Sequence, residues 1–450
     1  MGLFGNKAEK PGEQREFYMG IEDCFHLQDS TDMLVVGRVR GTIKPGDAVY
    51  IHNWTDTSNP ITMNTVRAIE IDHKPVNEAT DKAVAVVLEN VAEAGLIIGC
   101  VLATRNISAS DVHTAYVNAI GNAYVGRRKL DLADDVLKNM SITDLAEAWR
   151  LYNYAIQKGG MGIDDDTKTQ GEKINRLAAV MIDKILGLDE MHVVFSEKTG
   201  EPYLFSNTID NGNKSYKCTP PEVLIVTDPY LPVYKENYSK DGFEIRTIEN
   251  GENKKGIYNF LGEAFYLDGA CGVRINGQEV GIMADKLVPP PSYEGLPEIN
   301  IPVTNPDVMR WILLIGEMGK PETKDEDLIY RLYYSFFLEE LIKTKFLIPM
   351  KKDKDCPEPD ENGKTVITKD TRIAVPTLPG KGERPAVRMY TDWRMLHKEF
   401  DEEWSGIIMS IGDMIKAMDC AINITDHPAA GCYVDESMYN DAKARAEKNS

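Results

Sequence analysis

Apolar and polar segments follow one another in the same order in two stretches of this chain. The first stretch runs from about residue 183 to 288, and the second from about residue 338 to 439. In each, the end of a helical pattern leads directly into an apolar strand, and a Thr-Asp step comes later. Each closes with an apolar strand, a turn and a Gly-x-x-x-Asp segment. This order predicts an internal repeat of mixed strands and helices, with an α+β or α/β sheet domain in each copy.

The two Thr-Asp steps are candidate helix caps. They are Thr227-Asp228 and Thr391-Asp392, and each stands where an apolar strand gives way to a short helix. Thr and Asp in such places accept hydrogen bonds from the free N–H groups of the first helical turn. The repeat, and not proximity in sequence, pairs the two acids, so we expect caps rather than a carboxylate dyad.

The first half of the chain shows a different pattern. Residues 17–105 form short apolar strands separated by turn signals such as Pro45-Gly46, which predicts a small closed β-barrel. Residues 110–182 have helical periodicity, with Ser141 placed as a cap and Gly159 as a helix end, so we expect a helical connector.

These patterns predict a multidomain α+β protein. The expected segments are a flexible N-terminus (1–16), the barrel (17–105), the helical connector (110–182), two sheet domains (183–296 and 320–442) and a tail (443–450).

The barrel segment resembles the second domain of elongation factor Tu and related translational GTPases. The likeness lies in Ile21-Glu22-Asp23, in Gly37-Arg38-Val39 and in the stretch from Gly41 to Asp47, and it covers about a fifth of the chain. In that family the barrel packs on a GTPase domain and helps to hold tRNA or the ribosome, so the resemblance implies an association with the translation machinery. The chain has no Gly-x-x-x-x-Gly-Lys-Ser/Thr motif, so we expect no GTPase activity.

The repeated stretches resemble the SseB N-terminal-domain family. The second copy carries the resemblance in the strand from Phe346 to Met350, in Tyr390-Thr391-Asp392 and in the Ile422-Asn423 strand. The first copy departs from it, with Val226 in place of the aromatic residue and a polar insertion at residues 249–262. The resemblance implies two tandem SseB-like domains and no catalysis.

The charge of the chain argues against a nucleic-acid partner. Its formal net charge is -20, and residues 17–104 hold twelve acidic side chains against six basic ones. Such a surface repels phosphate backbones. Three barrel arginines, Arg38, Arg40 and Arg67, are nevertheless candidates for local RNA contacts, with solvated strand edges as the alternative.

No catalytic, cofactor or metal site is predicted. Cys271 is the one nucleophile considered, and no local motif supplies a partner His, so a core position is the stronger interpretation. The seven histidines are scattered without a His-x-x-x-His pair. The seven cysteines include no Cys-x-x-Cys and no apolar run could span a bilayer, so we expect a cytoplasmic protein without a membrane partner.

The leading hypothesis is a non-catalytic binding or adaptor protein that has a protein partner. Trp393, Phe400 and Trp404 form a candidate partner surface, although their spacing suits core positions equally well. Two other classes stay open. One is an enzyme with a cleft between the SseB-like copies, and the other is an acidic immunity-type protein that neutralises a basic partner.

Overall fold

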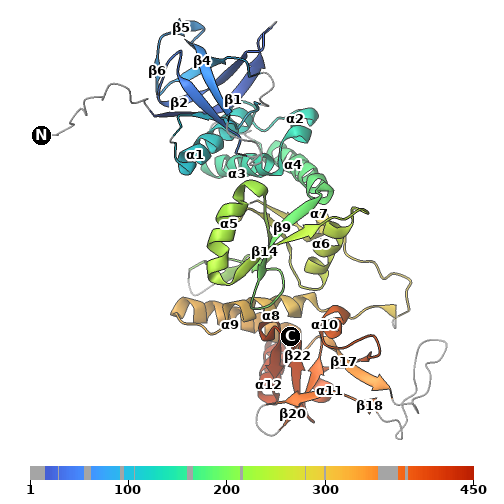
Figure 1. The fold of residues 1–450 in the computed structure, drawn as a ribbon. Helices are drawn as coiled ribbons and strands as arrows, with labels where there is room; N and C mark the ends of the chain where they lie inside the picture. Colours follow the sequence, from blue (N-terminus) through green and yellow to red (C-terminus); the bar gives the residue numbers. More distant parts are fainter. Residues whose placement is uncertain are drawn as a thin grey trace, which may run out of the picture. The chain divides into compact units, whose positions relative to one another are not determined.

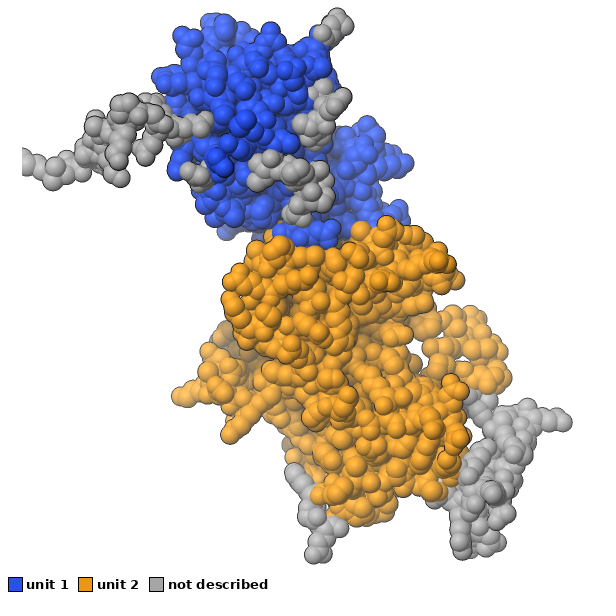
Figure 2. Space-filling view, viewed as in Figure 1, with its two compact units in different colours: residues 1–184, 227–229 blue, residues 185–226, 230–450 orange. Residues whose placement is uncertain are grey.

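The computed structural model divides the chain into two compact units (Figure 2). Unit 1 consists of residues 1–184 and 227–229, and unit 2 of residues 185–226 and 230–450. The structure describes residues 16–28, 30–54, 62–91, 96–105, 107–159, 166–212, 216–278, 280–297, 300–352, 373–380 and 384–449. The segment expected to be a flexible N-terminus lies outside these residues, apart from Glu16.

Unit 1 begins with a closed β-barrel, as the sequence predicts (Figure 1). The hydrogen-bonded order β1-β8-β3-β4-β7-β2 returns to β1, so six strands close on themselves. Alternate side chains, such as Val35, Val39 and Val49, are fully buried inside. The strands are β1 (Phe17–His26), β2 (Met33–Ile43), β3 (Ala48–His52), β4 (Thr62–Ile71), β7 (Ala83–Leu88) and β8 (Val101–Ala103), with short β5 (Lys74–Val76) and β6 (Ala79–Thr80) beside them.

Helices follow the barrel, as predicted for the connector. They are α1 (Ala109–Ile120), the π-helix η1 (Gly121–Gly126), α2 (Asp134–Asn139), α3 (Ile142–Lys158) and α4 (Thr167–Gly187). The side chain of Ser141 accepts a hydrogen bond from Asp144 N, and Gly159 ends α3 in the left-handed conformation. Both local signals for α3 are therefore confirmed.

Unit 2 contains a first mixed sheet in the order β14-β9-β13-β15-β16, in which β13 and β15 are parallel. Its strands are β9 (Glu190–Ser196), β10 (Leu204–Phe205), β13 (Glu222–Val226), β14 (Phe243–Glu249), β15 (Gly272–Ile275) and β16 (Gly281–Met283), and β11 (Thr208–Asp210) pairs β12 (Tyr216–Cys218) apart from it. Its helices are α5 (Leu231–Tyr238), η3 (Ser239–Asp241), α6 (Gly256–Tyr266) and α7 (Ala284–Leu287), and η2 (Asp228–Tyr230), whose first two residues belong to unit 1, precedes α5.

The second sheet of unit 2 has the corresponding order. β21 pairs β17, β17 reaches the end of β20 through an antiparallel bridge between Leu347 and Tyr390, and β20, β22 and β23 follow. Here β20 and β22 are the parallel pair. The strands are β17 (Lys345–Lys352), β18 (Ile373–Ala374), β19 (Thr377–Pro379), β20 (Pro385–Met389), β21 (Ser405–Ser410), β22 (Asp419–Ile422) and β23 (Cys432–Val434).

The helices that accompany the second sheet include one where a tail was expected. They are α8 (Pro306–Met318), α9 (Lys324–Leu341), α10 (Trp393–His397), α11 (Ile411–Met414), η5 (Pro428–Ala430) and α12 (Glu436–Asn449). Thr323 and Glu326 form a capping box at the start of α9. Residues 443–449 continue α12 instead of forming a tail, and Ala442 within this helix is fully buried in the core of the second sheet.

A buried ion cluster joins the two sheets within unit 2. Arg394 of α10 donates to Glu201 Oε2 at 3.0 Å and also pairs with Asp268, while Lys398 pairs with Glu201. Glu201 is 3% exposed and Asp268 is 1% exposed. Burial raises the pKa of Asp268, and the guanidinium of Arg394 opposes that rise. The two acids come from the segment of the first sheet and the two bases from that of the second, so the cluster fastens them together.

Candidate functional site

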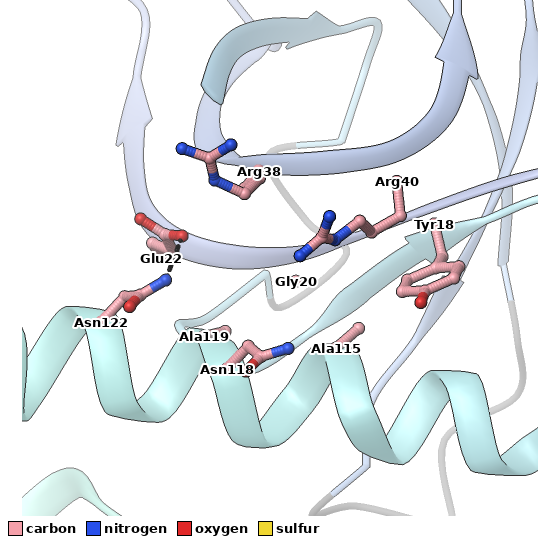
Figure 3. A pocket seen from close by; sticks show the side chains of 9 residues that line it. All are labelled: Tyr18, Gly20, Glu22, Arg38, Arg40, Ala115, Asn118, Ala119 and Asn122. Atoms are coloured by element: carbon pink, nitrogen blue, oxygen red, sulfur yellow. Dashed lines mark hydrogen bonds between the residues drawn. The ribbon is translucent and has the colours of Figure 1, made fainter. Parts of the chain in front are cut away.

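A small polar pocket lies in unit 1 between the barrel and the first helix of the connector (Figure 3). Its volume is about 130 Å³. The side chains around it are two guanidinium groups, a phenol, two amides and one carboxylate over a floor of small residues. They belong to Tyr18, Gly20, Glu22, Arg38, Arg40, Ala115, Asn118, Ala119 and Asn122.

Two neighbouring strands supply one wall of this pocket. Tyr18, Gly20 and Glu22 alternate along β1, so their side-chain positions share one face of the sheet. Tyr18 lies opposite Arg40 in the antiparallel register, and Gly20 lies opposite Arg38. The alternation that places β2 core residues such as Val39 inside the barrel therefore places both arginines outside, beside Tyr18 and Gly20.

Helical spacing supplies the other wall. Ala115, Asn118, Ala119 and Asn122 are three or four residues apart and share one helical face. A side chain at Gly20 would lie 2.2 Å from Ala115 O and 2.8 Å from the Ala119 methyl, so only glycine permits this approach of helix and strand. Asn122 lies in the π-helix η1, an element that is often found at functional sites.

Within the described residues, the two arginines of the pocket have no acidic partner of their own. Asn122 Nδ2 and Arg127 Nη2 each donate to the carboxylate of Glu22 at 2.8 Å, so this acid is already engaged. Arg38 Nη1 donates to Asp81 O at 3.3 Å. Among the residues that the structure describes, Arg38 and Arg40 form no ion pair, and both side chains are exposed. The pocket thus offers two cationic groups within an acidic domain.

The third candidate arginine lies outside the pocket. Arg67 is paired with Asp32, a nearly buried carboxylate that also accepts from Asn90 N at 3.0 Å. The backbone N–H of Asn90 first, and the guanidinium of Arg67 second, lower the pKa of Asp32 below its usual value. Arg67 therefore forms an ion pair within the barrel while its side chain is 60% exposed, and an RNA contact at Arg67 stays a prediction.

Asp392 is a helix cap, as predicted, whereas Thr391 is not. The Asp392 carboxylate accepts from Met395 N at 2.9 Å at the start of α10. The fully buried Thr391 hydroxyl donates to Asp392 Oδ2 at 2.8 Å and accepts from Asn423 Nδ2 at 2.9 Å. Thr391 points away from the free helical N–H groups because its hydroxyl is held between these two side chains, so it orients the cap.

The Thr227-Asp228 step differs from the Thr391-Asp392 step. Thr227 follows β13, and Asp228 begins η2. The Thr143 hydroxyl donates to the Thr227 hydroxyl at 2.9 Å. The longer helix α5 begins after Tyr230 without a side-chain cap. Capping of η2 by Thr227 and Asp228 therefore stays a prediction.

The aromatic residues expected at a partner surface are half-buried. Phe400 contacts Trp404 edge to face, with 4.7 Å between ring centroids, and Trp393 stacks on His397 at 5.7 Å. These contacts are internal to unit 2, and a partner surface at these three residues stays a prediction.

The remaining candidate chemistry lies outside the pocket. Cys271 is half-buried, and burial raises the pKa of its thiol, which disfavours the reactive thiolate. Within the described part of the chain, no three His, Cys, Asp or Glu side chains lie together as metal ligands. Across those same ranges, no helix has the length and apolar character required to cross a membrane.

Sequence reasoning named the two arginines but missed most of the pocket around them. Asn118 and Asn122 line the pocket only because α1 and η1 pack against β1, which is a tertiary contact. The available signals were the alternation of Tyr18, Gly20 and Glu22 and the four-residue spacing of Ala115 and Ala119.

Comparison with known proteins gives only a partial likeness to solved structures. No family model and no curated protein matches the chain. Among solved structures, the translation elongation factor SelB from Methanococcus maripaludis is similar to it, both in complex with the GTP analogue GppNHp and in its apo form. In each case the identity is 20%, the match covers 20% of this chain and 19% of SelB, and the TM-score is 0.18. The match thus spans about a fifth of either chain, and the closed barrel described above rests on its own strand pairing.

Proposed function

We propose that this chain is a non-catalytic binding protein that holds an anionic group of its partner in the Arg38–Arg40 pocket. The observation that carries the proposal is the presence of two exposed guanidinium groups beside Tyr18 and Asn118, without an acidic partner among the described residues. Guanidinium groups form charge-assisted hydrogen bonds to anions, and these are stronger than neutral ones.

The lining groups suit binding better than bond cleavage. No Ser, Thr, Cys, His or Lys is among the nine residues around the pocket. The carboxylate of Glu22 is engaged by Asn122 and Arg127 and so is not a free base. Gly20 and the two alanines leave the floor without a polar side chain, so the anion is contacted from the walls.

The proposal also concerns the two sheets of unit 2. We propose that its two sheets are duplicated SseB-like domains. The matching strand order supports this proposal. Asn276 directly follows β15 and Asn423 directly follows β22, and their φ angles of 50° and 49° support it as well. Each donates its N–H to the preceding parallel strand, at Ile225 O and Met389 O respectively. Cytoplasmic location and association with the translation machinery belong to the proposal as expectations from the sequence.

The proposal is tested by anion titration of the full chain labelled with ¹³C at alanine methyl groups. Acetate, sulfate and inorganic phosphate are added in turn, and the methyl resonances of Ala115 and Ala119 are followed. We expect at least one anion to shift both resonances in a saturable way, while buried Ala442 in α12 stays unchanged. The absence of such a shift with all three anions would contradict the proposed function.

A further inference from the structure

We infer that the anionic group held in this pocket is a carboxylate that stands next to a short apolar group. The inference rests on the proposed function and narrows its ligand class. Three features of the pocket carry it, namely its charge, its hydrogen-bonding groups and its floor.

The charge of the lining favours a singly charged ligand. Arg38 and Arg40 contribute two positive charges, and Glu22 contributes one negative charge on the same wall. Glu22 cannot readily turn away, because Asn122 and Arg127 hold both of its oxygens at 2.8 Å. A phosphate monoester carries about -1.5 to -2 charges at neutral pH. Such a group would bring a second negative charge close to the Glu22 carboxylate, whose own charge Arg127 balances from outside the lining, whereas a carboxylate brings only one charge.

The hydrogen-bonding groups match a carboxylate with an amide beside it. The planar guanidinium fork fits the two oxygens of a carboxylate. Asn118 has an amide oxygen that accepts and an amide nitrogen that donates, so it can pair with an N–H group next to the carboxylate. Tyr18 adds a hydroxyl and one face of a ring.

The floor accepts a small apolar substituent. The Ala119 methyl group and the Ala115 carbonyl oxygen pack closely against Gly20 and close the floor, so an apolar substituent rests on this floor and does not enter the space beside Gly20. A volume of about 130 Å³ leaves room for a carboxylate with a methyl or similar group. The same chemistry occurs in small free carboxylic acids and at the C-terminal residue of a peptide.

The test compares a carboxylate with its neutral amide in the full chain. N-acetyl-L-alanine, N-acetyl-L-alaninamide, acetate and inorganic phosphate are titrated, with the Ala115 and Ala119 methyl resonances as readout. We expect saturable shifts with N-acetyl-L-alanine and none with the amide. Tighter binding of N-acetyl-L-alanine than of acetate identifies a peptide C-terminus as the source, and equal binding identifies a small free acid.

Two variants with a matched control sharpen the result. Arg40→Gln should weaken N-acetyl-L-alanine binding on the order of tenfold. Arg105→Gln, which changes an exposed arginine of unit 1 outside the pocket, should leave it unchanged. Glu22→Gln should raise phosphate affinity relative to carboxylate affinity.

Failure of the inference and failure of the proposed function give different results. Binding of phosphate without binding of either carboxylate would overturn the inference and leave the proposed function standing. Equal binding of the acid and its amide, or an unchanged phosphate preference in Glu22→Gln, would also overturn it. If no anion binds, both are overturned.

Discussion

The Thr391 hydroxyl shows how a buried polar side chain acts through its neighbours. It links the Asp392 carboxylate to the Asn423 amide and is itself 0% exposed. Thr391→Ala removes this link and leaves both partners with an unmet hydrogen bond inside the core. We therefore expect a loss of about 1–3 kcal/mol in the free energy of unfolding, measured by urea denaturation. The control is Thr323→Ala in the exposed capping box of α9, with an expected cost of about 1 kcal/mol. A Thr391→Ala cost below that of the control would contradict the orienting role.

Ionisation of Asp32 makes the stability of the barrel depend on pH, and the lowered pKa fixes the direction of this dependence. Its pKa in the folded chain is lowered, so the ionised form is stabilised by folding. The contribution is complete above the unfolded pKa of about 3.9 and disappears as the pH falls through the lower folded value. The difference in urea midpoint between the wild type and Asp32→Asn should accordingly be constant from neutral pH to about 5 and shrink below 4. A difference that grows on acidification would contradict this assignment.

At the residue scale, local signals were readable from the sequence and tertiary ones were not. The cap at Ser141 was predicted because a cap depends on residues within one turn. Arg38, Arg40 and Arg67 were named as barrel arginines that could make local contacts, and only the fold shows that Asp32 engages Arg67.

At the scale of elements, the buried ion cluster gives the clearest stability prediction for unit 2. Arg394→Met leaves Glu201 and Asp268 buried without their main cation, and breaking a buried pair in this way typically costs about 3–5 kcal/mol. We expect a lower unfolding temperature for unit 2 in calorimetry. Arg331→Met is the control, because the Arg331–Asp327 pair on α9 is exposed and such pairs contribute about 0.3–0.5 kcal/mol. Equal effects of the two substitutions would contradict a fastening role.

The order of elements could be predicted from the sequence further than their pairing. Short strands with turns indicated the barrel, and helical periodicity indicated the connector. A closed barrel was predicted, but the strand order β1-β8-β3-β4-β7-β2 could not be read, because it depends on pairing between strands and not on any one strand's pattern. Only residues 443–449 of α12 were expected as part of a tail, and they are mostly polar, whereas Ala442 just before them reaches the core.

For the molecule as a whole, charge decides which nucleic-acid interactions are open to it. The net charge of -20 opposes a phosphate backbone, and the two pocket arginines can contact only a single group. We therefore predict no tight binding of free tRNA by the full chain in a gel shift at about 0.15 M salt. Submicromolar binding that collapses as salt is raised would contradict the charge argument and favour a translation role.

The most direct test of the account is quantitative capture of partners from the native source. Full chain, the double variant Arg38→Gln/Arg40→Gln and the control Arg105→Gln serve as baits, and the captured proteins are quantified by mass spectrometry. We expect some proteins to be captured by the wild type and by the control but not by the double variant. The reason is that only the double variant removes the cationic groups of the pocket. Identical recovery with all three baits, including recovery of nothing, would contradict it.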